Sequence, residues 1–199
     1  MKALCIGRNY VLHAKELNNE VPEEPVVFIK PETAIFYSGA FEIPDFSNNL
    51  QYEVELVVKI ASNIKNVDEK QADNSWEEIA LGIDFTARDL QQKLKEKGLP
   101  WEKAKAFDQS AFVSPFVPRP SITDIEFALL KNAQQVQKGN TSEMLFSINQ
   151  LIAHCSKYFT LQTGDLLFTG TPAGVGRLES GDRLQGQLMG KEIFELEVI

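Results

Sequence analysis

Two glutamates inside an apolar segment constrain this chain more than any other feature of its sequence. Residues 52–58 read Tyr-Glu-Val-Glu-Leu-Val-Val, a pattern that predicts a β-strand. Residues two apart on a strand face the same side, so Glu53 and Glu55 project together, roughly 7 Å apart at the backbone. Two carboxylates at that spacing repel by about 2 kcal/mol at an effective dielectric constant of about 20. Water or a cation must therefore offset the repulsion at this place.

A third carboxylate, Asp84, ends the apolar run of residues 80–83. If this run is a core strand, Asp84 lies at its end, where its carboxylate can face the edge of a binding site. Three oxygen ligands without a nearby Cys or His favour a hard cation, Mg²⁺ first and then Mn²⁺ or Ca²⁺. The alternative is that Glu53 and Glu55 form the solvated face of an edge strand.

Composition narrows the class of protein. The chain has 199 residues, 43% of them hydrophobic and 24% charged, which fits one globular domain over residues 1–199. A net charge of −8 argues against a nucleic-acid partner and fits an enzyme of small molecules. No apolar run reaches the length of a membrane span, and the N-terminus lacks a secretory apolar segment, so a cytoplasmic protein with no membrane partner is expected.

Short apolar segments dominate the pattern of predicted elements. Strands are expected over residues 2–6, 26–29, 35–43, 52–60, 127–136, 165–169, 184–188 and 191–198, and helices over residues 9–17, from residue 75, over 85–95 and over 141–158. Many strands with a few helices predict an α+β, strand-rich fold with a rolled or sandwiched sheet.

Three further groups of side chains carry possible chemistry. His13 and Glu16 lie three apart on a predicted helix, where a carboxylate can orient an imidazole for proton transfer; a surface pair is the alternative. Arg88 and Gln91 have the same spacing on the helix after Asp84 and could place a cation and an amide at the mouth of the metal site; a solvated helix face is the alternative. Lys105 has apolar neighbours, so its ammonium group is either partly enclosed or simply solvated.

A glycine-rich turn follows the predicted strand at 165–169. Residues 169–176 read Thr-Gly-Thr-Pro-Ala-Gly-Val-Gly, without the Gly-Lys-Ser/Thr ending of a nucleotide-binding loop. Its N–H groups and threonine hydroxyls could instead hold a carboxylate, or the segment is a tight turn without a ligand.

Taken together, these segments resemble the fumarylacetoacetate hydrolase family. The matching pieces, in order, are Gly-Arg-Asn-Tyr at 7–10 with His13 and Glu16, Phe-Ile-Lys-Pro at 28–31, residues 52–56, Gly-Ile-Asp-Phe-Thr-Ala-Arg-Asp-Leu-Gln at 82–91, Gly-Leu-Pro-Trp at 98–101, Lys105, and residues 169–176. They span almost the whole chain. The subgroup that the chain resembles most is that of the short acylpyruvate hydrolases, which also decarboxylate oxaloacetate.

The resemblance implies a mixed β-roll fold, a homodimer and one Mg²⁺ or Mn²⁺ per subunit. It implies metal ligation by Glu53, Glu55 and Asp84, and an acid/base pair of His13 and Glu16 on a segment that closes over the substrate in relatives. It also places Lys105 in a catalytic role and Arg88, Gln91 and Thr171 around a small oxo-acid substrate. Lys30 matches the family as well, without an assigned role.

The first expectation for the reaction is hydrolysis of a C–C bond in a 2,4-dioxo acid, with release of pyruvate. Decarboxylation of oxaloacetate would pass through the same pyruvate enolate. The alternative is isomerisation or tautomerisation of an oxo acid such as 2-hydroxyhepta-2,4-diene-1,7-dioate or oxaloacetate, which needs a proton shuttle but no attacking water. A third alternative is a binding protein that kept the fold without catalysis.

Overall fold

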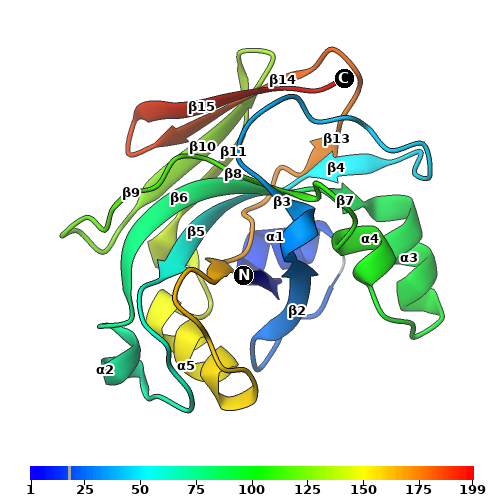
Figure 1. Cartoon of the computed structure of the whole chain (residues 1–199). Coiled ribbons are helices and arrows are strands. Elements are labelled where there is room, and N and C mark those ends of the chain that lie inside the picture. Colours follow the sequence, from blue (N-terminus) through cyan, green and yellow to red (C-terminus); the bar gives the residue numbers. More distant parts are fainter. Residues whose placement is uncertain (18) are drawn as a thin grey trace.

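The computed structural model describes residues 1–17 and 19–199 (Figure 1). The strands are β1 (Lys2–Gly7), β2 (Val26–Pro31), β3 (Ile35–Phe36), β4 (Leu50–Tyr52), β5 (Val54–Ile60), β6 (Trp76–Asp84), β7 (Thr86–Ala87), β8 (Ala111–Val113), β9 (Val117–Pro118), β10 (Glu126–Lys131), β11 (Gln134–Asn140), β12 (Leu166–Phe168), β13 (Gly176–Arg177), β14 (Arg183–Leu188) and β15 (Lys191–Glu197). The α-helices are α1 (Val11–Glu16), α2 (Glu69–Ala72), α3 (Arg88–Glu96), α4 (Glu102–Lys105) and α5 (Ile148–Tyr158), with 3₁₀ turns at Glu32–Ala34 and Thr141–Glu143.

Most of the strands belong to one mixed sheet with the order β2-β1-β12-β5-β6-β8-β3, and β9 also pairs with β6. The β1–β12 and β3–β8 pairs are parallel, and the other pairs are antiparallel. A second sheet has the order β11-β10-β14-β15, and a small third sheet joins β13, β4 and β7. The α+β, strand-rich architecture expected from the sequence is therefore confirmed.

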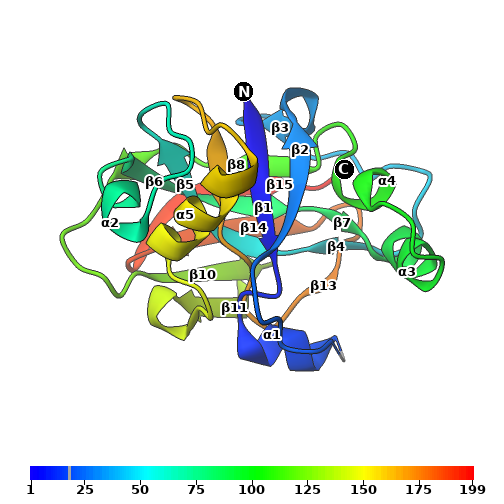
Figure 2. The ribbon, with the colours of Figure 1, turned by 90° about the horizontal axis from the view of Figure 1, so that it is seen from below.

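One side of the large sheet packs against the second sheet and against α5. Figure 1 shows β10, β14 and β15 lying across β5 and β6, and Figure 2 shows α5 beside β1. Alternate residues of the strands form this core: Leu56 and Val58 of β5, Leu81 of β6, and Phe127 and Leu129 of β10 are all fully or almost fully buried in one hydrophobic cluster. This alternation is the period of two that a strand imposes.

The opposite side of the same strands carries smaller side chains and leads to the acidic residues. Val57 and Ala80 belong to a second, smaller cluster with Cys5 and Phe168. Glu55 and Glu53 lie two and four residues before Val57 on one strand segment, and Asp84 lies four residues after Ala80 on the other. All three acidic residues therefore face the side of the sheet that carries this cluster. Both sides of β5 are thus buried, and the acidic residues lie where the apolar lining of one side ends.

The prediction of a helix that begins at Ser75 is wrong, because residues 76–84 form β6 in the middle of the large sheet. The residues Glu77 and Glu78 favour a helix locally, but pairing with β5 on one side and with β8 and β9 on the other outweighs that preference. The helix start lies earlier, at α2, where Asp68 and Gln71 form a capping box.

Two predicted strands are divided in the structure. The segment 52–60 breaks at Glu53, because β4 pairs with β7 and β13 whereas β5 pairs with β6 and β12. The segment 127–136 is a hairpin of β10 and β11 that turns at Asn132 and Ala133, both with positive φ (52° and 64°).

Of the helices in residues 1–17 and 19–199, none has the length and apolar character that crossing a bilayer requires.

We expect Gly82→Ala to destabilise the fold. A Cβ at this position would lie 2.5 Å from Phe168 Cε1 and 2.7 Å from Val57 Cγ2, and both side chains are fully buried. Overpacking of this kind costs about 1–3 kcal/mol. Urea unfolding should therefore have a lower midpoint in Gly82→Ala. The control is Gly7→Ala, where the nearest atom is 3.9 Å away; equal midpoints for the two variants would contradict this packing.

Candidate active site

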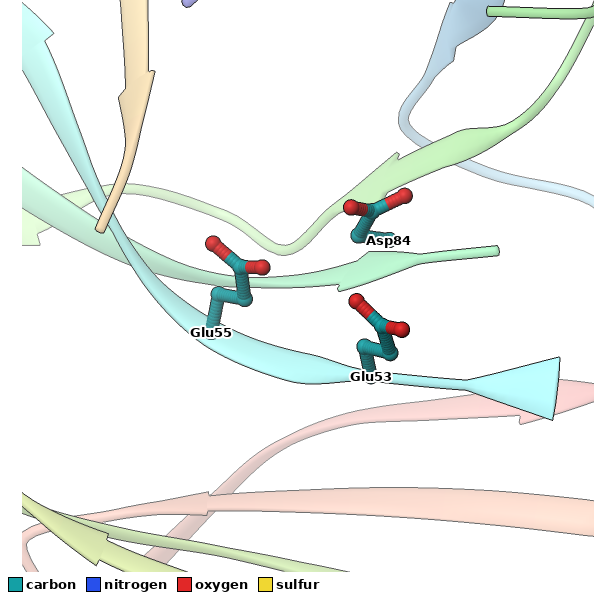
Figure 3. A group of neighbouring side chains, drawn as sticks. All are labelled: Glu53, Glu55 and Asp84. Carbon is teal, nitrogen blue, oxygen red and sulfur yellow. The ribbon is translucent and has the colours of Figure 1, made fainter. Parts of the chain in front are cut away.

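The carboxylates of Glu53, Glu55 and Asp84 converge on one point. Figure 3 shows Glu53 and Glu55 pointing from one strand segment toward Asp84 on the neighbouring one. Each residue offers a carboxylate oxygen within 4.8 Å of the other two, and the exposed fractions of the residues are only 5%, 2% and 0%. The alternative of a solvated edge strand is therefore excluded.

Backbone pairing holds the carboxylates in this arrangement. Glu55 lies opposite Gly82 in the β5–β6 ladder, and the N–H of Asp84 donates to the carbonyl of Glu53 at 2.8 Å. Where the ladder breaks, the N–H of Val54 donates to the side-chain oxygen of Gln137 at 2.9 Å. At the break, the carbonyl of Glu53 and both backbone groups of Val54 are therefore hydrogen-bonded.

Basic side chains surround the acidic group. The ammonium group of Lys105 donates to Glu53 Oε2 at 2.8 Å, to Asp84 Oδ2 at 2.7 Å and to Thr86 Oγ1 at 2.6 Å. Lys30 Nζ lies 2.9 Å from Asp84 Oδ1, and the guanidinium group of Arg88 donates to Glu53 Oε1. Lys105 is buried, which confirms that its ammonium group is enclosed.

These charges move the pKa values of neighbouring groups in different directions. Burial raises the pKa of Glu53, but Lys105 and Arg88 outweigh it, so this pKa falls below its usual range. Burial, Asp84 and Glu53 together raise the pKa of the Glu55 carboxyl well above its usual value. The basic side chains thus favour the ionised form of Glu53, whereas burial and the two neighbouring carboxylates disfavour the ionised form of Glu55.

The donor set fits a hard divalent cation. All three residues supply carboxylate oxygens, and a cation would offset the mutual repulsion that raises the pKa of Glu55. Lys105 already contacts two of the three carboxylates, so a cation would compete with its ammonium group for Glu53 and Asp84. Glu53, Glu55 and Asp84 would hold the ion, and the ion would supply positive charge to an oxygen of the substrate.

His13 and Glu16 form a contact on α1. His13 Nδ1 donates to Glu16 Oε2 at 3.2 Å, and Glu16 Oε1 accepts the N–H of Gly174 at 3.0 Å. His13 is buried and lines the pocket that contains the three carboxylates. The imidazole therefore faces the pocket, where Nε2 is available for proton exchange, and the hydrogen bond from Nδ1 to Glu16 fixes the orientation of the ring.

The glycine-rich turn does bind carboxylates, but they are the protein's own. The N–H of Gly170 donates to Glu55 Oε2 at 2.7 Å, and Gly174 binds Glu16 as described. Gly170 has φ of 101°, and a Cβ there would lie 2.7 Å from Asn9 Cβ, so this position requires glycine. The turn thus contacts both Glu55, one of the three converging carboxylates, and Glu16, the hydrogen-bond partner of His13.

Arg88, Gln91 and Thr171 line the same pocket. Arg88 donates to Gln91 Oε1 at 2.6 Å, which leaves the amide NH₂ group of Gln91 for other acceptors. The Thr171 hydroxyl donates to the carbonyl of Val54 at 2.8 Å and accepts from Gln137 at 2.9 Å, so it also holds the turn against β5. All of the predicted site residues except Glu16 line this pocket directly.

Sequence reasoning missed the contribution of two buried polar residues and of one pocket residue. Lys30 is fully buried and donates to the carbonyl of Ser110 at 2.9 Å and to that of Lys105, which positions the end of α4. Gln137 is buried on β11, between the partly buried Val136 and the exposed Lys138, and no local pattern marks it. Arg8 also lines the pocket; its positive φ of 63° depends on the tertiary structure.

Fold and site together define a member of the fumarylacetoacetate hydrolase family, to which this chain belongs: the family model "Fumarylacetoacetate (FAA) hydrolase C-terminal" matches residues 2–198. The chain is 44% identical over 188 residues to the oxaloacetate tautomerase YcgM of Escherichia coli. The aligned region covers 92% of this chain and 86% of that protein. It is 41% identical to the mitochondrial oxaloacetate tautomerase FAHD1 of Bos taurus, with coverage of 94% and 86%.

A solved structure extends the comparison to the fold. The fumarylpyruvate hydrolase of Pseudomonas aeruginosa in complex with Mn²⁺ and pyruvate superposes with a TM-score of 0.94 at 33% identity, covering 100% of this chain and 89% of that one. The resemblance seen in the sequence is thus confirmed.

We expect Glu55→Gln to weaken binding of Mn²⁺ and Mg²⁺ by at least about tenfold, because it replaces one of the three converging carboxylates with a neutral amide. Calorimetric titration measures this. Glu77→Gln, at an exposed position on β6, is the matched control and should bind like the wild type. Equal affinity in Glu55→Gln and Glu77→Gln would remove Glu55 from the metal site.

We expect Lys105→Met to strengthen Mn²⁺ binding by about tenfold, because it removes a positive charge that contacts two of the ligands. Lys103→Met, at an exposed position on the same helix, is the control. Weaker binding in Lys105→Met would mean that Lys105 orders the carboxylates rather than competing with the ion.

Proposed function

We propose that this protein is a metal-dependent enzyme that interconverts the enol and keto forms of oxaloacetate. The curated relatives named above support this substrate and reaction, since both are oxaloacetate tautomerases at 41–44% identity over most of the chain. The relatives thereby favour tautomerisation over the hydrolysis that the sequence placed first.

The observation that carries the proposal is the placement of His13. One imidazole lines the pocket beside the three carboxylates, and both oxygens of Glu16 are already bonded, to His13 and to Gly174. Keto–enol conversion needs one group that moves a proton to or from a carbon atom. A buried imidazole oriented by a carboxylate suits that task.

The residues of the chain then divide the reaction between them. In ketonisation, the enol hydroxyl at C2 gives its proton to solvent water, C3 gains a proton from the imidazolium form of His13, and His13 is then reprotonated from solvent. His13 donates the proton to C3 through Nε2, while Glu16 stabilises the imidazolium form that exists before the transfer. The ammonium group of Lys105 lies beside the ligands and stabilises negative charge on the C2 oxygen. Arg88 and Gln91 orient the adjacent carboxylate of the substrate.

Hydrolysis of acylpyruvates is the second candidate function. The likeness to a fumarylpyruvate hydrolase with Mn²⁺ and pyruvate favours it. Here Glu16 would accept the proton of an attacking water, which requires it to release the N–H of Gly174 or the His13 ring. Decarboxylation of oxaloacetate could use the same groups that stabilise the C2 oxygen.

We further propose Mg²⁺ or Mn²⁺ as the ion, residues 1–199 as a single catalytic domain, and a cytoplasmic location. We also propose a homodimer. Strand β2 is an edge of the large sheet, and its apolar residues Val26–Ile29 are only half-buried, so a second copy could cover them. A monomeric mass in sedimentation equilibrium would contradict this last proposal.

We expect His13→Gln to lower kcat for enol-oxaloacetate by about 10²–10⁴-fold, because glutamine cannot deliver a proton. Its Mn²⁺ affinity should stay within about twofold of the wild type, since His13 is not among the carboxylate ligands. Loss of the enol absorbance measures the rate. The controls are Lys15→Gln, at an exposed position on α1, and the metal ion without protein.

The variant Glu16→Gln distinguishes tautomerisation from hydrolysis, because the two reactions should respond differently to loss of this carboxylate. If tautomerisation is the activity, this variant should keep part of it, because His13 still lines the pocket; cleavage of acetylpyruvate should be no faster than with the metal ion alone in any variant. Rapid pyruvate release from acetylpyruvate by the wild type, abolished in Glu16→Gln, would instead identify a hydrolase. An unchanged tautomerase rate in His13→Gln would remove His13 from the mechanism.

A further inference from the structure

The pocket contains positive charge that the acidic group does not use. Arg8 and Lys95 line it together with the carboxylates. Glu53 and Asp84 form ion pairs with Lys30, Arg88 and Lys105, and His13 pairs with Glu16. Within the described residues, neither Arg8 nor Lys95 takes part in an ion pair. Both residues are half-buried, so solvent alone does not compensate them fully.

The position of Lys95 follows from the helix that carries Arg88. Arg88, Gln91 and Lys95 have the spacing i, i+3, i+7, which places them along one face of α3. The rise of 1.5 Å per residue puts Lys95 about 10 Å along the axis from Arg88, whose guanidinium group contacts Glu53. Lys95 Nζ donates to Asn19 Oδ1 at 2.9 Å, which holds the ammonium group at this end of the pocket.

The position of Arg8 follows from an unusual backbone conformation. Arg8 comes directly after β1 and has φ of 63°, a region that residues other than glycine rarely adopt. The next residue, Asn9, fixes this turn, since its buried side chain donates to the carbonyl of Thr169 at 2.8 Å and accepts the N–H of Phe146 at 2.9 Å. A rigid turn thus presents the guanidinium group of Arg8 to the pocket.

We propose that Arg8 and Lys95 form a second anion subsite, which binds the distal carboxylate of a short dicarboxylic 2-oxo acid and makes the enzyme selective for dicarboxylates. This inference rests on the proposed function, which places the 2-oxo acid end of the substrate at Glu53, Glu55 and Asp84.

The charges of the pocket support this division. A divalent ion with Lys30, Lys105 and Arg88 outweighs the three carboxylates and leaves positive charge for a substrate carboxylate at that end. Arg8 and Lys95 remain, and burial together with repulsion from Arg8 and Arg88 lowers the pKa of Lys95. A second carboxylate between them would relieve that repulsion, and the planar guanidinium group suits a carboxylate partner.

The test compares two unreactive ligands with the same head group. L-malate and L-2-hydroxybutyrate share a 2-hydroxy acid end, but malate has a carboxylate where the other has a methyl group. Calorimetry on Mg²⁺-saturated protein measures both dissociation constants. We expect the wild type to prefer malate by about tenfold or more, as for one charged hydrogen-bonded contact. Arg8→Gln and Lys95→Gln should each remove most of this preference and leave 2-hydroxybutyrate affinity within about twofold.

Lys93→Gln, at an exposed position on α3, is the matched control and should keep the preference. The two test variants lie on separate elements, so a folding defect in one leaves the other informative. Equal affinity of the wild type for both ligands, or a preference that survives in both variants, would overturn the subsite and leave the proposed function standing. Failure of the wild type to bind either ligand would overturn both.

Discussion

The burial of Glu53, Glu55 and Asp84 beside basic side chains is the interaction on which the rest of the site depends. Carboxylates removed from water are costly unless they are paired and hydrogen-bonded. Here Lys105, Lys30 and Arg88 compensate Glu53 and Asp84, while Glu55 receives one backbone N–H and keeps a raised pKa. The arrangement pairs two of the carboxylates within the protein interior and leaves Glu55, without an ion pair among the described residues, as a ligand for a divalent ion.

Distant parts of the chain are held together around this group of charges. The turn at residues 169–176 binds Glu55 at Gly170 and Glu16 at Gly174, so one short segment spaces the carboxylates relative to the histidine on α1. Lys30 binds the carbonyl of Lys105 and thereby places the ammonium group that contacts Asp84. Because the turn contacts both Glu55 and Glu16, a small displacement of it would alter both the carboxylate site and the proton-transfer pair.

The pocket thus has two ends with different chemistry. At one end, carboxylates suited to a hard cation lie beside Lys105 and His13, which fits chemistry on a 2-oxo acid. At the other end, Arg8 and Lys95 offer charge without an acidic partner among the described residues. Such a division lets one end stabilise charge during the reaction while the other selects the substrate.

The sequence by itself determined the strand-rich class, the family and the identity of the acidic residues, because alternation along a strand and spacing along a helix are local properties. His13 and Glu16 were predictable as a pair for the same reason. Tertiary structure decided the rest: pairing of β6 on both sides overrode the helical preference near Ser75, and the hairpin at Asn132 divided an apparently continuous strand. The convergence of Lys30, Gln137 and Arg8 on the site also required the fold, since contacts between residues far apart in the chain leave no local pattern to read.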